Sequence, residues 1–107
     1  MYKFKIEIDG DSKELAGDLK RELGESCTIS VFDSKGLLGS EAVVIAIIAA
    51  APGIITTIAT VVQAYLKRNN DKSVSFENSN GKRTYSGYTL KEIKELEAFL
   101  TSDAPNQ

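Results

Sequence analysis

The feature that most constrains the fold is an uncharged stretch of 25 residues, Ala42 to Leu66, in a chain of 107. At helical spacing its large apolar side chains fall on one side and its small residues on the other. The pattern predicts one long helix, kinked or divided in two at Pro52-Gly53, because proline inside a helix removes a backbone hydrogen bond and clashes with the preceding turn. The small side of this helix is a candidate face for a partner or for self-association. It is formed by Ala42, Ala46, Ala49, Gly53 and Thr57.

The chain before this stretch predicts a strand, a helix and a second strand. Residues 2–8 alternate apolar and polar, as in a strand with one side in water. Residues 11–24 begin with a capping box and end on Gly24, which is expected to take the left-handed conformation that closes many helices. Residues 27–32 are rich in β-forming side chains and predict a strand paired parallel to the first through a right-handed crossover.

The chain after the apolar stretch predicts a hairpin and a final helix. Asn80-Gly81 is a strong signal for a two-residue turn between strands at 73–78 and 82–88. A second capping box at 89–92 begins an amphipathic helix.

The expected fold is an α/β or α+β sandwich with a four-stranded mixed sheet and helices packed on the sheet. Its order is strand, helix, strand, long helix kinked near Pro52, strand, strand, helix. We expect a single domain over residues 1–101 and a flexible C-terminal tail over 102–107.

Composition excludes several classes of function. The net charge of −2 argues against a nucleic-acid binder, which needs a basic face. The absence of histidine excludes histidine-based triads and most zinc sites. The single cysteine, Cys27, is expected to be a small buried hydrophobe and not a nucleophile. No catalytic constellation or cofactor motif is present, so we predict a non-enzymatic protein that uses no cofactor.

Five basic residues near the end of the apolar stretch and in the hairpin predict a second candidate site. If they converge, they form a patch for an anion or an acidic partner. They also suit a structural role, since such charges complement the end of a helix dipole and protect a sheet edge, and this interpretation is favoured. The five residues are Lys67, Arg68, Lys72, Lys82 and Arg83.

Two interpretations of the stretch 42–66 lead to different functions. A helix of this length would extend about 37 Å, enough to cross a bilayer, and would suit a small membrane-active or pore-forming protein. A span would, however, divide the predicted strands into two marginal halves. We therefore favour a buried helix in a cytoplasmic protein that lacks a secretion signal and acts by binding another protein or by self-association, with the membrane-associated protein as the alternative.

The order of these features resembles a family of small bacterial proteins, the effector-associated constant component domains. The resemblance covers nearly the whole chain and is one of pattern. It rests on the leucine helix Leu15–Leu19–Leu23, the loop from Gly36 to Gly39, the Ala-rich segment that ends Tyr65-Leu66-Lys67-Arg68, and the hairpin Asn80-Gly81-Lys82 before a short amphipathic helix. It implies a non-enzymatic adaptor that partners an effector enzyme, such as a protease, in a bacterial conflict or defence system.

Overall fold

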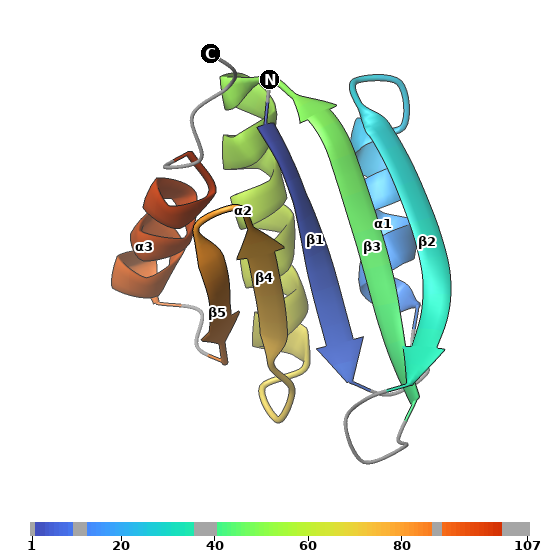
Figure 1. The fold of residues 1–107 in the computed structure, drawn as a ribbon. Coiled ribbons are helices and arrows are strands. Elements are labelled where there is room, and N and C mark those ends of the chain that lie inside the picture. The colour runs from blue at the N-terminus through green and yellow to red at the C-terminus, as the bar shows by residue number, and fades with distance from the viewer. Residues whose placement is uncertain (1, 10–12, 36–40, 87–88, 102–107) are drawn as a thin grey trace.

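The computed structural model describes residues 2–9, 13–35, 41–86 and 89–101. In this part of the chain, five strands form one antiparallel sheet. In the view of Figure 1 the first two helices lie behind it and the third lies at its left edge. The elements are β1 (Tyr2–Asp9), α1 (Glu14–Leu23), β2 (Thr28–Lys35), β3 (Glu41–Ala50), α2 (Pro52–Arg68), β4 (Val74–Asn78), β5 (Gly81–Tyr85) and α3 (Leu90–Thr101).

The strands are arranged in the order β2-β3-β1-β4-β5, and every neighbouring pair is antiparallel. β1 and β2 therefore run in the same direction with β3 between them, and β3 and β4 run in the same direction with β1 between them. Both helical crossovers pass behind the sheet and are right-handed (Figure 1). The first six elements thus have the split β-α-β topology of ferredoxin-like folds, to which β5 and α3 are added. The expected α+β class with helices on a sheet is confirmed. The sheet, however, has five strands and not four, it is antiparallel and not mixed, and β1 and β2 are not hydrogen-bonded partners.

The prediction of a helix over 42–66 is wrong for its first half, whereas the expected helix that begins with Pro52 in its first turn is confirmed. Residues 41–50 form β3, which lies between β1 and β2, and only residues 52–68 are helical. Ala51, which precedes proline, has extended dihedral angles (φ −74°, ψ 160°), and Pro52 occupies the first turn of α2, where its missing N–H costs no hydrogen bond. No helix in the described ranges is long and apolar enough to cross a bilayer, and the proposed span over 42–66 does not form.

β3 carries a bulge near its end. Tyr2 pairs with Ala50 and Phe4 pairs with Ile47, so one residue of β1 faces two of β3. Ala49 lies in this bulge with φ of 67°, a left-handed conformation that a residue with a Cβ atom seldom adopts.

The core fills the space between the sheet and the helices. Alternate residues of β1 and β3 point into it, as the predicted strand pattern of residues 2–8 requires, and each helix buries one apolar side. Burial of each large side chain contributes about 1.5–3 kcal/mol before the entropy of folding is subtracted. The largest contributors include Phe4, Ile6, Ile8, Leu15, Leu19, Leu23, Ile45, Ile47, Ile55, Ile58, Tyr65, Leu66, Phe76, Leu96, Phe99 and Leu100.

The predicted ends of the elements are confirmed in part. Thr89 accepts a hydrogen bond from the backbone N–H of Glu92 at 3.3 Å, as a capping box requires. The hairpin is also present, but its two-residue loop is Ser79-Asn80, and Gly81 (φ 128°) already pairs with Asn78. Gly24 follows α1 in a right-handed conformation, not the expected left-handed one. The predicted cap at Asp11, the loop 36–39 and the tail 102–107 lie outside the described residues.

Candidate functional site

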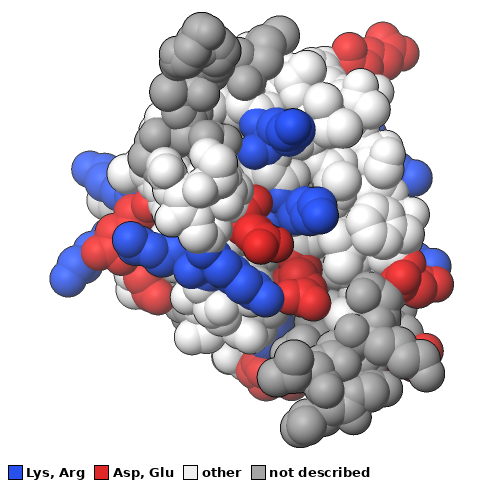
Figure 2. Space-filling view, in the orientation of Figure 1, with Lys and Arg blue, Asp and Glu red and all other residues white. Residues whose placement is uncertain are grey.

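The face of the sheet opposite the helices is the main candidate site, and we call it the outer face. In the described part of the chain no helix or strand covers it, and it faces the viewer in Figures 1 and 2. The strand alternation that sends Ile45 and Phe76 into the core sends their neighbours to this side. An apolar half over β2 and β3 consists of Phe32, Val44, Ala46 and Ile48. A charged half over β1, β4 and β5 consists of Lys3, Lys5, Glu7, Glu77 and Lys82.

The apolar half leaves large side chains in contact with solvent. Phe32 is 46% exposed and Ile48 is 43% exposed, whereas the helix-side residues of β3 are fully buried. Phe32 pairs with Val44 across the two strands, so these side chains are adjacent. In an antiparallel sheet with one covered face, the solvent side is usually polar, and a group of exposed apolar side chains marks an interaction surface.

The charged half contains both paired and unpaired groups. The Lys82 ammonium lies 2.9 Å from Glu7 Oε1, and it reaches Glu7 over the short side chain of Ser75 on β4. Lys3, Lys5 and Glu77 form no ion pair with another described residue. Figure 2 shows blue side chains in the middle of this face, with a surface to their right, over β3 and β2, that is mostly uncharged.

Two open hollows lie where the halves meet. One, of ≈ 430 Å³, is bordered by Lys3, Lys5, Ala46, Ile48 and Glu77 among others. The second, of ≈ 290 Å³, shares Lys5 and Glu77 and extends to Phe32 and Lys82. Both arise because short side chains, Ala46 in the first and Ser75 in the second, stand among long ones. Such shallow hollows receive side chains of a partner surface more readily than they enclose a small molecule.

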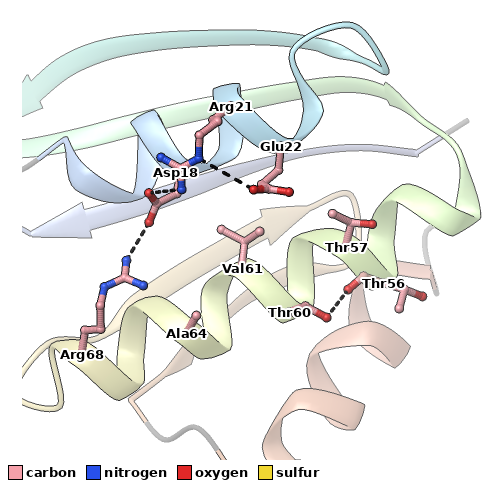
Figure 3. Close-up of a pocket in the computed structure, with 9 residues that line it drawn as sticks. All are labelled: Asp18, Arg21, Glu22, Thr56, Thr57, Thr60, Val61, Ala64 and Arg68. Atoms are coloured by element: carbon pink, nitrogen blue, oxygen red, sulfur yellow. Dashed lines mark hydrogen bonds and ion pairs between the residues drawn. The ribbon is translucent and has the colours of Figure 1, made fainter.

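A groove between α1 and α2 is a further concave feature, with a volume of ≈ 370 Å³ (Figure 3). Its charged groups are engaged with one another, since Arg68 lies 2.7 Å from both Asp18 and Glu14, and Arg21 lies 3.0 Å from Asp18. Thr60 on its floor donates a hydrogen bond to the backbone of α2 itself. These contacts hold the two helices together and satisfy the polar groups that line the groove.

The predicted small-residue face does not exist as one surface, because it assumed the long helix. Ala42, Ala46 and Ala49 belong to β3, whereas Gly53 and Thr57 belong to α2. Ala42 is buried, Ala46 lies on the outer face, and Thr57 lines the groove between α1 and α2.

The five predicted basic residues do not converge either. Arg68 is paired with α1, and Lys82 lies on the outer face. Arg83 points to the helix side, where its guanidinium carbon lies 5.3 Å from the centre of the Phe99 ring on α3. Lys67 and Lys72 are exposed near the end of α2. Of the five, only Lys82 contributes to the candidate site.

Away from the outer face, burial shifts the pKa of three described side chains, one thiol and two phenols. Burial raises the pKa of the Cys27 thiol, which disfavours the thiolate that a nucleophile needs. Burial also raises the pKa of the Tyr65 and Tyr85 phenols. Within the described ranges, no group of three or more potential ligands is placed to hold a metal ion.

Sequence reasoning missed the apolar half of the outer face and found part of the charged half. The alternation of residues 2–8 already placed Lys3, Lys5 and Glu7 on the water side. Phe32 lies in the predicted strand 27–32, but its pairing with Val44 could not be foreseen without β3. Val44 and Ile48 were missed because residues 43–48 were interpreted at helical spacing. Their β-branched composition was the available signal.

Comparisons of the chain with protein-family models, with curated proteins and with solved structures find no match. The resemblance to the effector-associated constant component domains therefore stays a prediction. What bears on function is the chemistry of the outer face: exposed apolar side chains on two strands beside unpaired lysines on the next.

Proposed function

We propose that the chain is a non-enzymatic protein-binding module that docks a partner protein on its outer face. The observation that carries this proposal is the exposure of Phe32 and Ile48, together with the half-buried Val44, beside charged side chains. Protein interfaces have this composition, with an apolar and aromatic centre surrounded by a polar rim. A sheet face of this kind contributes binding free energy when a partner removes the apolar half from water.

Other classes of ligand fit the outer face less well. Proteins that bind single-stranded nucleic acid on a sheet stack bases on several aromatic side chains, and Phe32 is the only aromatic among the large apolar residues exposed in the described part. Acid–base catalysis by the carboxylates of this face is disfavoured, because Glu7 is held by Lys82 and Glu77 lies at the edge of open hollows.

The resemblance of the sequence supports a more specific role. On that basis we propose an adaptor that acts in the bacterial cytoplasm and partners an effector enzyme of a conflict or defence system. Association with a second copy of the chain is the other use that an apolar sheet face allows.

A matched pair of variants tests the docking proposal. Ala46→Arg places a long cation in the middle of the outer face, and Thr60→Arg places the same side chain in the groove between α1 and α2. Tagged wild-type protein and both variants are used to capture partners from the native host, and bound proteins are quantified by mass spectrometry. We expect a partner that is retained by Thr60→Arg and lost with Ala46→Arg.

Circular dichroism and thermal unfolding establish that both variants fold. Equal retention of the partner by the two variants, or its loss with Thr60→Arg alone, would rule out docking on the outer face. Size-exclusion chromatography with light scattering measures the molar mass of the same three purified proteins. It shows whether the outer face binds a second copy of the chain or requires a different protein.

A further inference from the structure

We propose that the partner of the outer face is an acidic, apolar protein segment that places carboxylates on Lys3 and Lys5 and an apolar side chain beside Ile48. This inference rests on the proposed docking function and specifies the chemistry of its partner.

The charges of the outer face require an anionic partner. The charged half of this face, as defined above, has three lysines and two glutamates, which gives +1, whereas the whole chain carries −2. Glu7 is already neutralised by Lys82, so the groups that need a partner are mostly cationic. Lys3 and Lys5 lie beside the apolar half, and a protein that covers Ile48 also removes their ammonium groups from water. Desolvation of an unpaired ammonium is costly, so a stable complex must supply carboxylates.

The geometry of β1 sets the spacing of those carboxylates. Lys3 and Lys5 are two residues apart on one side of a strand, which separates their Cα atoms by roughly 6.6 Å. Carboxylates two residues apart on an extended segment have the same spacing, and carboxylates one turn apart on a helix have a similar one. The hollow of ≈ 430 Å³ has both lysines and Ile48 on its border, so one segment can reach all three.

Glu77 restricts how the segment lies. It pairs with Lys5 across β1 and β4, on the side of Lys5 away from the apolar half. Partner carboxylates are therefore repelled from the β4 side and favoured between β1 and β3. The acidic groups and the apolar anchor of the partner consequently lie next to each other.

Selection from a library of random peptides tests this chemistry without knowledge of the native partner. The intact protein is immobilised, the selected peptides are synthesised, and binding is measured by fluorescence anisotropy. We expect enrichment of peptides that combine acidic and large apolar residues, with affinity that falls as salt is added. In an NMR titration, the largest amide shifts should fall in β1, β3 and β4.

Neutralisation of the lysines gives the decisive comparison. Lys3→Gln with Lys5→Gln should weaken binding about tenfold, because two charge pairs are lost. Lys91→Gln with Lys94→Gln, on the exposed side of α3, makes the same change in net charge and should leave the affinity unchanged. These substitutions are on the surface, and thermal unfolding checks that both proteins are folded.

The possible failures separate the two proposals. Peptides that are lost with Ala46→Arg but insensitive to Lys3→Gln with Lys5→Gln would overturn the acidic chemistry and leave docking intact. Peptides whose binding survives Ala46→Glu as well as Ala46→Arg would overturn both, because a long side chain of either charge fills the hollow and only the arginine adds a cation for acidic groups. If the protein instead binds a single-stranded RNA oligonucleotide through Lys3 and Lys5, the proposal of a protein partner is overturned in favour of a nucleic acid.

Discussion

Ala49 is the described residue, other than glycine, whose backbone lies in the left-handed region, with φ of 67°. It occupies the bulge at which β3 gains a residue relative to β1. A Cβ atom in this conformation costs about 1 kcal/mol, because it approaches the following carbonyl oxygen. Glycine adopts such dihedral angles without this cost, and glycine is the usual residue in bulges of this kind.

We therefore expect Ala49→Gly to stabilise the protein. Relief of the backbone strain outweighs the greater freedom of glycine in the unfolded chain, and the free energy of unfolding should rise by up to about 1 kcal/mol. The control is Ala50→Gly at the next position of the strand. It removes a buried methyl group and should lower the free energy of unfolding. Urea unfolding of the two variants measures the difference. A loss of stability in Ala49→Gly as large as in Ala50→Gly would show that the bulge carries no strain.

Tyr65 and Tyr85 should make the protein unfold in alkali. Burial raises the pKa of each phenol above its usual value of about 10, and the Glu14 carboxylate raises that of Tyr65 further. As pH rises, the unfolded chain releases these protons first, so unfolding becomes more favourable. The stabilisation is complete below pH of about 10 and is lost as pH rises through the folded pKa values.

Tyr85→Phe isolates one of these contributions. The Tyr85 hydroxyl is buried and has no hydrogen-bond partner among the described residues, so its removal should cost little at neutral pH. The variant should lose less stability than the wild type between neutral and strongly alkaline pH. Urea unfolding across this range, together with phenolate absorbance, tests the expectation. An identical alkaline loss in both proteins would contradict it.

At the scale of elements, the sequence predicted most local structure and failed at β3. The alternation of residues 2–8, the leucine positions of α1 and the capping box before α3 each depend on neighbours within a few residues, and each predicted element is present. β3 differs because its inner side lies against the helices while its outer side carries Val44, Ala46 and Ile48, so it has no polar alternation to identify it. Residues 42–50 of β3 carry no charge, and α2 begins with apolar residues directly after them. The two elements together therefore had the sequence pattern of one long helix.

The candidate site was only partly predicted for the same reason. Ala46 and Lys5 are neighbours only because β3 pairs with β1, and this pairing joins residues about forty positions apart in the sequence. Local patterns carry no information on which strands pair. Lys5 was therefore correctly placed toward water, while the apolar side chains beside it were not foreseen.

The contact between α1 and α2 depends on Arg68, which lies 2.7 Å from Glu14 and from Asp18. We expect Arg68→Ala to lower the free energy of unfolding, because two carboxylates on α1 lose their shared cation. Lys67→Ala removes an adjacent exposed cation that has no ion pair among the described residues, and it should have less effect. In a double-mutant cycle with Asp18→Asn, the coupling free energy should be favourable at low salt and shrink in molar salt. A coupling near zero at low salt would mean that helix packing alone holds α1 and α2.

At the scale of the whole molecule, one apolar cluster joins the sheet to all three helices. Phe76 on β4 is fully buried in it, with its ring centre 6.4 Å from that of Phe4 and 6.0 Å from that of Tyr85. Phe76→Ala should therefore lower the free energy of unfolding by about 3–5 kcal/mol. Ser75→Ala, at the next position but on the outer face, should change it by less than about 1 kcal/mol.

Because this cluster includes residues of every helix, the whole chain should unfold in one cooperative transition. Far-ultraviolet circular dichroism and tyrosine fluorescence should report a single transition in the wild type and in Phe76→Ala, because every helix buries side chains against the same cluster. Separate transitions by the two probes would show that β5 and α3 unfold independently of the remainder.

The place of β1 between β3 and β4 has a consequence for biosynthesis. Lys5 pairs with Ala46 on one side and with Glu77 on the other, so β1 is synthesised before both of the strands that flank it. About half of these codons must be translated before β3 can pair with β1, and about three quarters before β4 covers its other edge, and until then Phe4, Ile6 and Ile8 lie in an incomplete sheet. Closure of such long loops slows folding, and the unpaired segment is a natural binding site for chaperones on the growing polypeptide.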